Sequence, residues 1–244
     1  MANDSCGIRT LAIDIGGSGL KMIVLDGEGR PIMERSRTPT PKNRTPDKVL
    51  AVLGEQIATQ GEFDRISVGF PGIVVDGVVH QAVNLGPAWD GFNIVKALED
   101  MTKKPVRVAN DADVQGLGVI DGRGVELVIT LGTGIGTALY VDGHSVPNLE
   151  FGHHPFSKGR TYEECLGNAA MKKAGKEKWN QRLKKAIKVW ERVFSYRMLY
   201  LGGGNARKIE FELPKNVRIV PNVAGLLGGI ALWRGKRPWI VDSF

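Results

Sequence analysis

A glycine-rich turn near the start of the chain combines groups that bind phosphate and metal ions. The segment DIGGSGLK places Asp14 at the end of an apolar run and Lys21 just after three glycines. Glycines adopt positive φ and let a phosphate approach backbone N–H groups. Asp14 can hold Mg²⁺ through water, and Lys21 can meet phosphate charge. A hairpin turn with a capping aspartate accounts for the same residues, so the segment alone leaves both interpretations open.

Two later turns can do similar work. The segment LGTGIGT, residues 131–137, follows an apolar run and adds two threonine hydroxyls to its glycines. It is not a P-loop, because no Gly-Lys-Ser/Thr follows. It is also unlike a dinucleotide-binding fingerprint, because a strand rather than a helix is expected after it. Gly202–Gly204 follow another predicted strand. Their backbone can lie against a nucleotide base or ribose, or can simply turn the chain.

A candidate acid–base residue follows a predicted strand. Asn110 and Asp111 come at its carboxyl end, where the ligand sites of α/β sheets gather. A carboxylate there can take a proton from an attacking hydroxyl. Either residue can equally well cap the helix that follows. Asp113 is interpreted as a first-turn charge that favours the helix dipole.

The segment EFGH carries a second polar cluster. Glu150 and His153 lie on a predicted tight loop, and Glu163 follows further along the chain. Sugar hydroxyls need donors and acceptors fixed in this way, so a sugar site is expected here. A lone histidine is usually structural, and no role is expected for His154.

The elements that must position these residues follow an α/β pattern. Two strand–glycine turn–strand units are expected, Thr10–Ile15 with Leu20–Leu25 and Leu127–Leu131 with Ile135–Val141, which suggests a duplicated lobe. Strands alternate with helices elsewhere, so the fold class is α/β. Further predicted elements are a strand at about 31–37, a helix at 162–173, a basic helix at 178–194 and a closing helix at 224–233.

The bulk composition is that of an ordinary globular protein. The chain has 244 residues, of which 42% are hydrophobic and 24% charged, enough to bury a core without a disulfide or metal staple. Cys6 and Cys165 form no zinc or disulfide pattern, which favours a reducing compartment. No signal peptide and no apolar run of about 20 residues is present. A cytoplasmic location without membrane insertion is therefore expected.

Positive charge is concentrated near the C-terminus. Residues 161–244 carry 17 Lys/Arg against 7 Asp/Glu, whereas the whole chain has a net charge of +7. The densest part is the block from Lys172 to Arg192. Such a block favours an anionic partner, which can be a nucleotide, polyphosphate, nucleic acid or a membrane surface. A solvated helix face accounts for it equally well.

In their order along the chain, these segments resemble the ROK family of sugar kinases, within the actin/hexokinase-like phosphotransferases. The matches run from residue 11 to residue 232: DIGGSGLK, GFPG, NLGPAW, NDAD, LGTGIG, EFGH, LGGG and NVAGLLGGIAL. Each is weak alone, whereas the ordered set is specific. Lys21 stands three residues after Ser18, which resembles the polyphosphate glucokinase branch. The family's cysteine-rich zinc motif is missing where Thr161–Gly167 stands, so zinc is not expected.

The resemblance implies a two-lobed actin/hexokinase-like fold of duplicated ribonuclease-H-like domains with a cleft between the lobes. The N-terminal lobe is expected over residues 1–108, with the closing helix, about 224–236, packing back on it. The C-terminal lobe is expected over residues 109–223. Related proteins are often dimers, so a homodimer is expected.

The resemblance also implies roles for individual residues. Asp111 would be the catalytic base. The sugar would be held by Asn84, Asn110, Glu150, His153 and Glu163, with Glu164 as a rival to Glu163. The phosphates would be bound by Asp14, Gly16, Gly17, Ser18, Gly19, Lys21, Gly132, Thr133, Gly134, Gly202, Gly203 and Gly204, and Asp14 would hold Mg²⁺ through water.

The expected function is a glucokinase that uses polyphosphate, ATP or both to phosphorylate the 6-hydroxyl of glucose. Two alternatives remain open: an ATP-dependent kinase for mannose, fructose or an N-acetylated sugar, and a non-catalytic sugar-responsive regulator. The regulators of this family carry an N-terminal DNA-binding domain, for which the first motif leaves no room. Specific binding of nucleic acid is therefore not expected.

Overall fold

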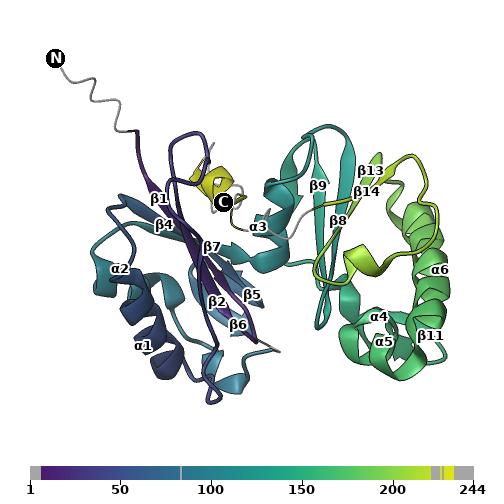
Figure 1. Cartoon of the computed structure of the whole chain (residues 1–244), viewed down its shortest axis with the longest axis horizontal. Helices are drawn as coiled ribbons and strands as arrows, with labels where there is room; N and C mark the ends of the chain where they lie inside the picture. The colour runs from purple at the N-terminus through teal and green to yellow at the C-terminus, as the bar shows by residue number, and fades with distance from the viewer. Residues whose placement is uncertain (1–6, 83, 221–225, 227, 234–244) are drawn as a thin grey trace, which may run out of the picture. The chain divides into compact units, whose positions relative to one another are not determined.

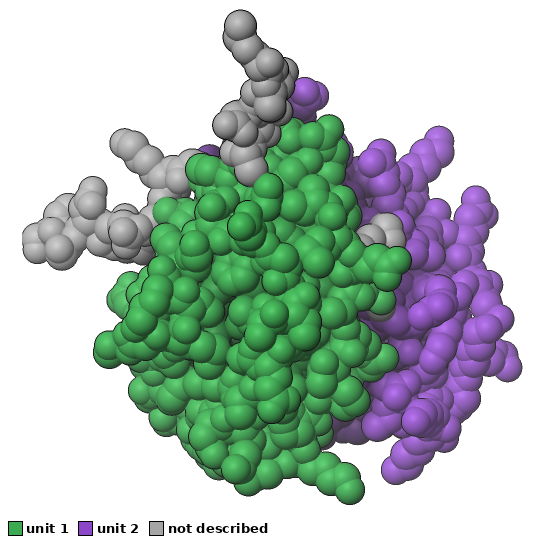
Figure 2. All heavy atoms as spheres, turned by 60° about the vertical axis from the view of Figure 1, so that its left-hand side comes forward, with its two compact units in different colours: residues 1–118, 225–244 green, residues 119–224 purple. Residues whose placement is uncertain are grey.

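The computed structural model describes residues 7–82, 84–220, 226 and 228–233. The chain forms two compact units, one of residues 1–118 with 225–244 and the other of residues 119–224, coloured green and purple in Figure 2. Each unit has its own five-stranded sheet and its own buried core (Figure 1). Among the described residues, no helix is both long enough and apolar enough to cross a membrane.

The sheet of unit 1 has the strand order β3-β2-β1-β4-β7. β1 lies antiparallel to β2 and parallel to β4, and β4 is parallel to β7. The strands are β1 (Thr10–Ile15), β2 (Leu20–Leu25), β3 (Ser36–Thr38), β4 (Arg65–Phe70) and β7 (Val106–Asn110). The strand expected at 31–37 is shorter and later than predicted. Proline has no N–H for a ladder, and Pro31 forms only an isolated bridge with Leu25.

One face of this sheet carries the larger core of unit 1. Leu11, Ile13 and Ile15 of β1 point to it, because alternate residues of a strand share a face. Helices α1 (Pro46–Ile57) and α2 (Ile94–Thr102) cover that face with apolar side chains at helical spacing. This face supplies packing rather than chemistry.

The opposite face of the sheet is covered by α3 (Asp111–Leu117) and by the 3-10 helix η4 (Gly228–Trp233). η4 contacts α3, β1 and β4. Of the closing helix expected at about 224–236, Leu226 is helical and residues 228–233 form a 3-10 helix. Residues 224, 225, 227 and 234–236 lie outside the described residues. α3 belongs to unit 1, while the expected lobe boundary at residue 108 stays a prediction.

The connection from β4 to α2 is anchored by Trp89. It contains the hairpin of β5 (Ile73–Val75) and β6 (Val78–Gln81), followed by the 3-10 helix η1 (Pro87–Trp89). Trp89 is fully buried, its ring lies 5.1 Å from that of Phe70, and its Nε1 donates to the Arg44 carbonyl at 2.7 Å. The intervening loop, which contains Asn84, is thereby held close to β4.

The sheet of unit 2 repeats the arrangement of unit 1, with the order β10-β9-β8-β13-β14. A central antiparallel hairpin is again extended by two parallel strands on one side and one antiparallel strand on the other. The strands are β8 (Val125–Leu131), β9 (Ile135–Val141), β10 (His144–Val146), β13 (Met198–Gly202) and β14 (Val217–Ile219). The two glycine turns therefore occupy equivalent positions in two copies of one topology.

Three helices cover one face of this second sheet: α4 (Tyr162–Leu166), α5 (Asn168–Ala174) and α6 (Lys176–Phe194). Buried side chains of α6 pack in one core with those of β8 and β13. The single helix expected at 162–173 is divided at Gly167, whose backbone is extended with ψ 167°. A methyl group at Gly167 would lie 2.9 Å from the Thr133 carbonyl, so the glycine allows this junction to press against the second glycine turn.

Candidate active site

The first glycine turn joins β1 to β2 and carries an ion pair. Asp14 and Lys21 are register partners across the hairpin, and Lys21 Nζ donates to Asp14 Oδ2 at 2.6 Å. The turn closes where the Gly16 amide donates to the Gly19 carbonyl at 3.0 Å. The side chains of Asp14 and Lys21 remain 25% and 33% exposed, so a phosphate or a hydrated metal ion can reach them.

Two residues outside the sequence motifs, Arg37 and Thr40, also border this turn. Arg37 on β3 is the register partner of Lys21, and its Nε would lie 3.0 Å from a methyl group at Gly19. The Thr40 hydroxyl donates to the Gly16 carbonyl at 2.5 Å. Nothing in the local sequence marks either residue as functional. The strand register is what brings Arg37 to the turn, and it adds a second cation beside Lys21.

Asn84 lies beside the same turn, although it is distant in sequence. A methyl group at Gly17 would lie 3.3 Å from the Asn84 carbonyl oxygen, and Arg44 donates to that oxygen at 3.0 Å. Gly17 thus allows the Asn84 loop to approach the turn. Ser18 is exposed at the tip.

Asn110 is the N-cap of α3, so Asp111 does not serve as the cap. The Asn110 Oδ1 accepts from the amide of Ala112 at 2.8 Å, as an N-cap side chain does. Its Nδ2 donates to the Gly72 carbonyl at 3.2 Å. Asp111 is the first residue of α3 and is half-buried. A methyl group at Gly69 would lie 3.4 Å from the Asp111 Cα. The glycine in β4 therefore allows α3 to pack closely against the sheet.

Asp14 and Asp111 lie at the same edge of the sheet of unit 1. In the register, Asp14 pairs with Gly69 and Gly69 pairs with Ala109. Both acids therefore stand at the carboxyl ends of parallel strands, where α/β sheets bind ligands. The strand ends that carry them are two spacings apart, or about 10 Å. That separation is wide enough for a phosphoryl group to lie between the two strand ends.

The second glycine turn, in unit 2, is held by two asparagines. The Gly132 amide donates to the Gly134 carbonyl at 3.1 Å, which closes the turn. The Asn168 amide, at the start of α5, donates to the Gly132 carbonyl at 3.1 Å. Asn205 Nδ2 donates to the same oxygen at 3.1 Å. Neither asparagine was marked by the sequence, because each acts through a contact remote along the chain.

Gly202–Gly204 adjoin this second turn. In the parallel register of β13 and β8, Gly202 pairs with Thr130. Gly203 has φ +84°, and a methyl group there would lie 2.4 Å from the Leu131 carbonyl. Only glycine fits such a position. The predicted phosphate residues of unit 2 thus form one continuous edge.

Glu150, His153 and Glu163 gather at the same end of unit 2. His153 Nε2 lies 3.7 Å from Glu150 Oε2. Partial burial raises the pKa of Glu150 above its ordinary value of 4.5, with His153 opposing the shift and Glu163 adding to it. The Glu150 carboxylate thus interacts electrostatically with both the His153 imidazole and the Glu163 carboxylate. Groups of these types can accept hydrogen bonds from sugar hydroxyls and donate to them.

The structure gives Glu163 and Glu164 different partners. The Glu164 carboxylate accepts from the Thr161 amide at 2.8 Å, and the Glu164 amide donates to the Thr161 hydroxyl at 3.1 Å. These bonds form the capping box of α4. The Glu163 carboxylate instead accepts from the Ile135 amide at 3.1 Å, directly after the glycine turn. Glu163 is therefore the one that lies beside the second glycine turn.

Aromatic rings hold the Glu150 loop against α4 and α6. Phe151, in the 3-10 helix η2 (Phe151–His153), has its ring 5.0 Å from that of Tyr162 and 4.9 Å from that of Phe194. Tyr162 in turn lies 5.5 Å from Trp190. The segment Thr161–Gly167, which lacks the cysteines of the zinc motif, is thus packed by a cluster of rings.

The family model for ROK proteins matches residues 10–186. The chain belongs to the ROK family. The polyphosphate glucokinase of Mycobacterium leprae (strain TN) is 32% identical over 240 residues, which cover 91% of this chain and 72% of that protein. The polyphosphate glucokinase of Mycobacterium tuberculosis (strain CDC 1551 / Oshkosh) is 30% identical and covers 88% of both chains.

Solved structures of ROK proteins share this fold. The inorganic polyphosphate/ATP-glucomannokinase of Arthrobacter sp. strain KM superposes with a TM-score of 0.83 at 33% identity, over 93% of this chain and 100% of that one. A ROK family glucokinase from Streptomyces griseus, solved with glucose and AMPPNP, gives a TM-score of 0.77 at 18% identity, over 92% and 98% of the two chains. The expected actin/hexokinase-like α/β fold is confirmed.

The residues of this ROK chain fit a Mg²⁺ ion held loosely through water. Mg²⁺ keeps several waters and takes one or two carboxylates together with substrate phosphates. Lys21 engages only Oδ2 of Asp14, and among the described residues nothing donates to its Oδ1. Asp14 can therefore accept from a metal-bound water while it remains paired with Lys21.

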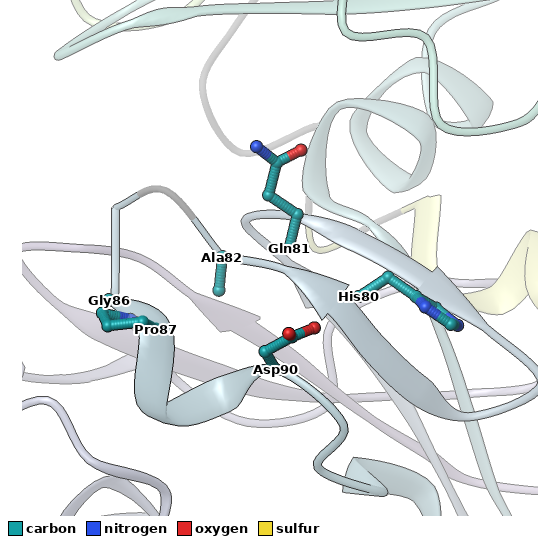
Figure 3. A pocket seen from close by; sticks show the side chains of 6 residues that line it. All are labelled: His80, Gln81, Ala82, Gly86, Pro87 and Asp90. Carbon is teal, nitrogen blue, oxygen red and sulfur yellow. The ribbon is translucent and has the colours of Figure 1, made fainter.

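Unit 1 of the ROK chain also contains a pocket of about 310 Å³ that follows the hairpin β5–β6 (Figure 3). Its polar lining comes from the end of β6 and from the turn after η1. None of the lining residues is a predicted ligand, although two of them belong to the segment NLGPAW. The lining residues are His80, Gln81, Ala82, Gly86, Pro87 and Asp90.

Proposed function

We propose that this chain is a glucokinase that transfers the terminal phosphoryl group of inorganic polyphosphate or ATP to the 6-hydroxyl of glucose. The observation that carries the proposal is the likeness to two polyphosphate glucokinases and to the polyphosphate/ATP-glucomannokinase, which extends over nearly the whole chain. The predicted metal-binding and acid–base residues, Asp14 and Asp111, lie within residues 10–186, which the family model matches. Mannose is a second candidate acceptor, because the Arthrobacter enzyme is a glucomannokinase.

Asp111 is assigned as the base. In phosphoryl transfer the protein mainly positions the reactants and stabilises charge. A carboxylate that accepts the proton of the attacking hydroxyl adds about 10²–10⁴-fold. Asn110 caps α3 through its own side chain, so Asp111 is held at a helix start without acting as the cap. Its position at the carboxyl edge of β7 supports this role.

The phosphates are assigned to the two glycine turns and their cations. Among the described residues, no hydrogen bond engages the amides of Gly17 or Thr133, so both N–H groups can point at a phosphate oxygen. Lys21 and Arg37 supply positive charge at the first turn. When bound, Mg²⁺ would neutralise charge on the donor phosphates. Asp14 would orient one of its waters while its other carboxylate oxygen stays paired with Lys21.

The sugar is assigned to the five polar residues that the resemblance to ROK kinases implies. Glu150, His153 and Glu163 accept from and donate to its hydroxyls, and Glu163 rather than Glu164 takes part because Glu164 caps α4. Asn84 and Asn110 are the other two residues assigned to the sugar. Both asparagines are fixed by backbone contacts, Asn84 through its carbonyl and Asn110 through its amide.

We further propose that the protein acts in the cytoplasm as a homodimer and binds no specific nucleic acid. The cysteine usage supports the location. The dimer stays a prediction from the resemblance. Sedimentation analysis of the purified protein tests it directly, and a monomer would contradict it.

The deciding assay follows glucose 6-phosphate with glucose, Mg²⁺ and either ATP or long-chain polyphosphate. Product with at least one donor is expected, and no product with either contradicts the proposal. Asp111→Asn should lower kcat by about 10²–10⁴-fold and leave the melting temperature unchanged. The matched control is Asp47→Asn, which alters an exposed aspartate in the first turn of α1 and should leave kcat unchanged. A wild-type rate for Asp111→Asn would remove Asp111 from the mechanism.

A further inference from the structure

The exposed face of α6 is divided into two edges of different charge. Its buried side, with Trp179, Leu183 and Trp190, packs in the core of unit 2. Along one edge of the exposed side, basic residues recur at helical spacing. The members of this basic stripe are Lys178, Arg182, Lys185, Lys188 and Arg192. The other edge carries Glu177, Glu191 and Lys184, so its charges offset one another.

The basic stripe lacks acidic partners. Lys178, Lys185, Lys188 and Arg192 are exposed, and no carboxylate of the described residues lies within ion-pair distance of them. By contrast, Lys176 at the start of the same helix pairs with Glu210. Like charges along one edge of a helix repel each other. An anion that binds to the stripe relieves this repulsion and so lowers the free energy of the protein.

A chain of contacts links the stripe to the second glycine turn. Arg182 donates to the Cys165 carbonyl at 3.3 Å, and Trp179 Nε1 donates to the Leu166 carbonyl at 2.6 Å. The next residues, Gly167 and Asn168, contact the turn itself: the Asn168 amide donates to the carbonyls of Gly132 and Thr133. Figure 1 shows α4 and α5 beside one end of α6. The N-terminal part of the stripe is therefore fixed to the phosphate edge of unit 2.

We propose that the basic stripe of α6 binds the distal phosphates of a long polyphosphate donor. This inference rests on the proposed function and names where the part of the donor that does not react is held. The stripe runs from Lys178 to Arg192, about 21 Å at the rise of an α-helix. It therefore suits an extended polyanion that reaches well beyond the reacting phosphoryl group.

The chemistry of the stripe favours polyphosphate over other polyanions. Proteins that bind single-stranded nucleic acid use exposed aromatic rings on which bases stack, but Trp179 and Trp190 of α6 are fully buried. A helix that lies on a membrane inserts an apolar face, but the apolar face of α6 is in the core. What remains on the surface is a row of cations, which phosphate oxygens satisfy without bases or lipid.

The test replaces Lys178, Lys185 and Lys188 together by Gln. The KM for long-chain polyphosphate should rise roughly tenfold, as expected for the loss of three exposed ion pairs. The KM values for ATP and for tripolyphosphate, and kcat with all donors, should not change. The matched control replaces Lys158, Lys184 and Lys215, which are exposed lysines of unit 2 outside the stripe, and should leave every constant unchanged. Equal effects of the two triple variants, or an equal rise of KM for tripolyphosphate, would overturn the proposal.

A binding measurement separates this inference from the proposed function. Fluorescence anisotropy of end-labelled long-chain polyphosphate should show binding by the wild type and by the control, and weaker binding by the stripe variant. Such a result with no turnover of polyphosphate would support the stripe and refute polyphosphate as the donor. Absence of binding by the wild type would overturn the stripe. Displacement of the label by an oligothymidylate or an anionic vesicle at equal charge concentration would also overturn it, in favour of a nucleic-acid or membrane surface.

Discussion

The carboxylate of Glu163 lies directly against Gly134, so that a methyl group at Gly134 would stand 2.1 Å from Glu163 Oε2. The same oxygen accepts from the Ile135 amide at 3.1 Å. A residue assigned to the sugar and a residue assigned to the phosphates are therefore parts of one packed structure. A shift of either must displace the other.

Gly134→Ala tests this relationship. The added methyl group must push the Glu163 carboxylate away, and a displacement near 1 Å at a reacting site costs about 100-fold in rate. We expect kcat/KM for glucose to fall by about that factor and the melting temperature to decrease. Adding Glu163→Ala to Gly134→Ala should restore the melting temperature but not the activity. Additive losses of stability in the double variant would show that the two residues do not clash.

Substitutions of Asn110 separate capping from sugar binding. Asn110→Ala should destabilise the protein by about 1 kcal/mol, because the amides of α3 lose their acceptor. Asn110→Ser keeps a capping oxygen but loses the amide that donates to Gly72. We expect Ser to restore the stability seen in denaturant unfolding, while the KM for glucose stays raised in both variants. A wild-type KM in the Ser variant would refute the sugar contact.

The raised pKa of Glu150 predicts a pH-dependent stability difference. Because burial raises this pKa in the folded state, ionisation of Glu150 opposes folding. The wild type loses stability as the pH rises from 4.5, the pKa of Glu150 in the unfolded chain, to the higher pKa in the folded protein. Above the folded-state pKa the loss is constant. Glu150→Gln, which cannot ionise, should therefore melt at a higher temperature than the wild type at neutral pH. Thermal unfolding across this range checks the sign, and the opposite order at neutral pH would contradict it. Glucose phosphorylation should fall in the same variant.

Gly228 packs against α3, the helix that begins with Asp111. A methyl group at Gly228 would lie 1.8 Å from the Val114 carbonyl of α3, so Gly228→Ala must move α3 or η4. We expect kcat to fall by more than KM changes, together with a lower melting temperature. Ala231→Ser, a change of similar size at a half-buried position in the same 3-10 helix, is the control and should leave kcat intact. If Gly228→Ala lowers stability but not kcat, the packing of η4 does not position Asp111.

The strand–glycine turn–strand units could be predicted from the sequence. Strand–glycine turn–strand units depend on neighbours a few residues apart, so Asp14, Lys21 and Gly132–Gly134 could be located from their motifs. The duplicated topology followed from the repetition of that unit, and the likeness to known ROK proteins confirmed the family. Asn110 and Asp111 were found together, but the sequence could not say which one caps the helix.

The tertiary structure decided what depends on contacts remote along the chain. The sequence by itself determined the motifs, the family and the basic block, since composition and short spacings carry them. Strand register brought Arg37 to the first turn, and the capping box of α4 gave Glu164 a different partner from that of Glu163. The break at Gly167 was not predicted, and the glycine packs there against the Thr133 carbonyl, which is far away in sequence. Hydrogen bonds and packing of this kind arise only when distant segments meet, because local propensity contains no information about which partner a folded neighbour will supply.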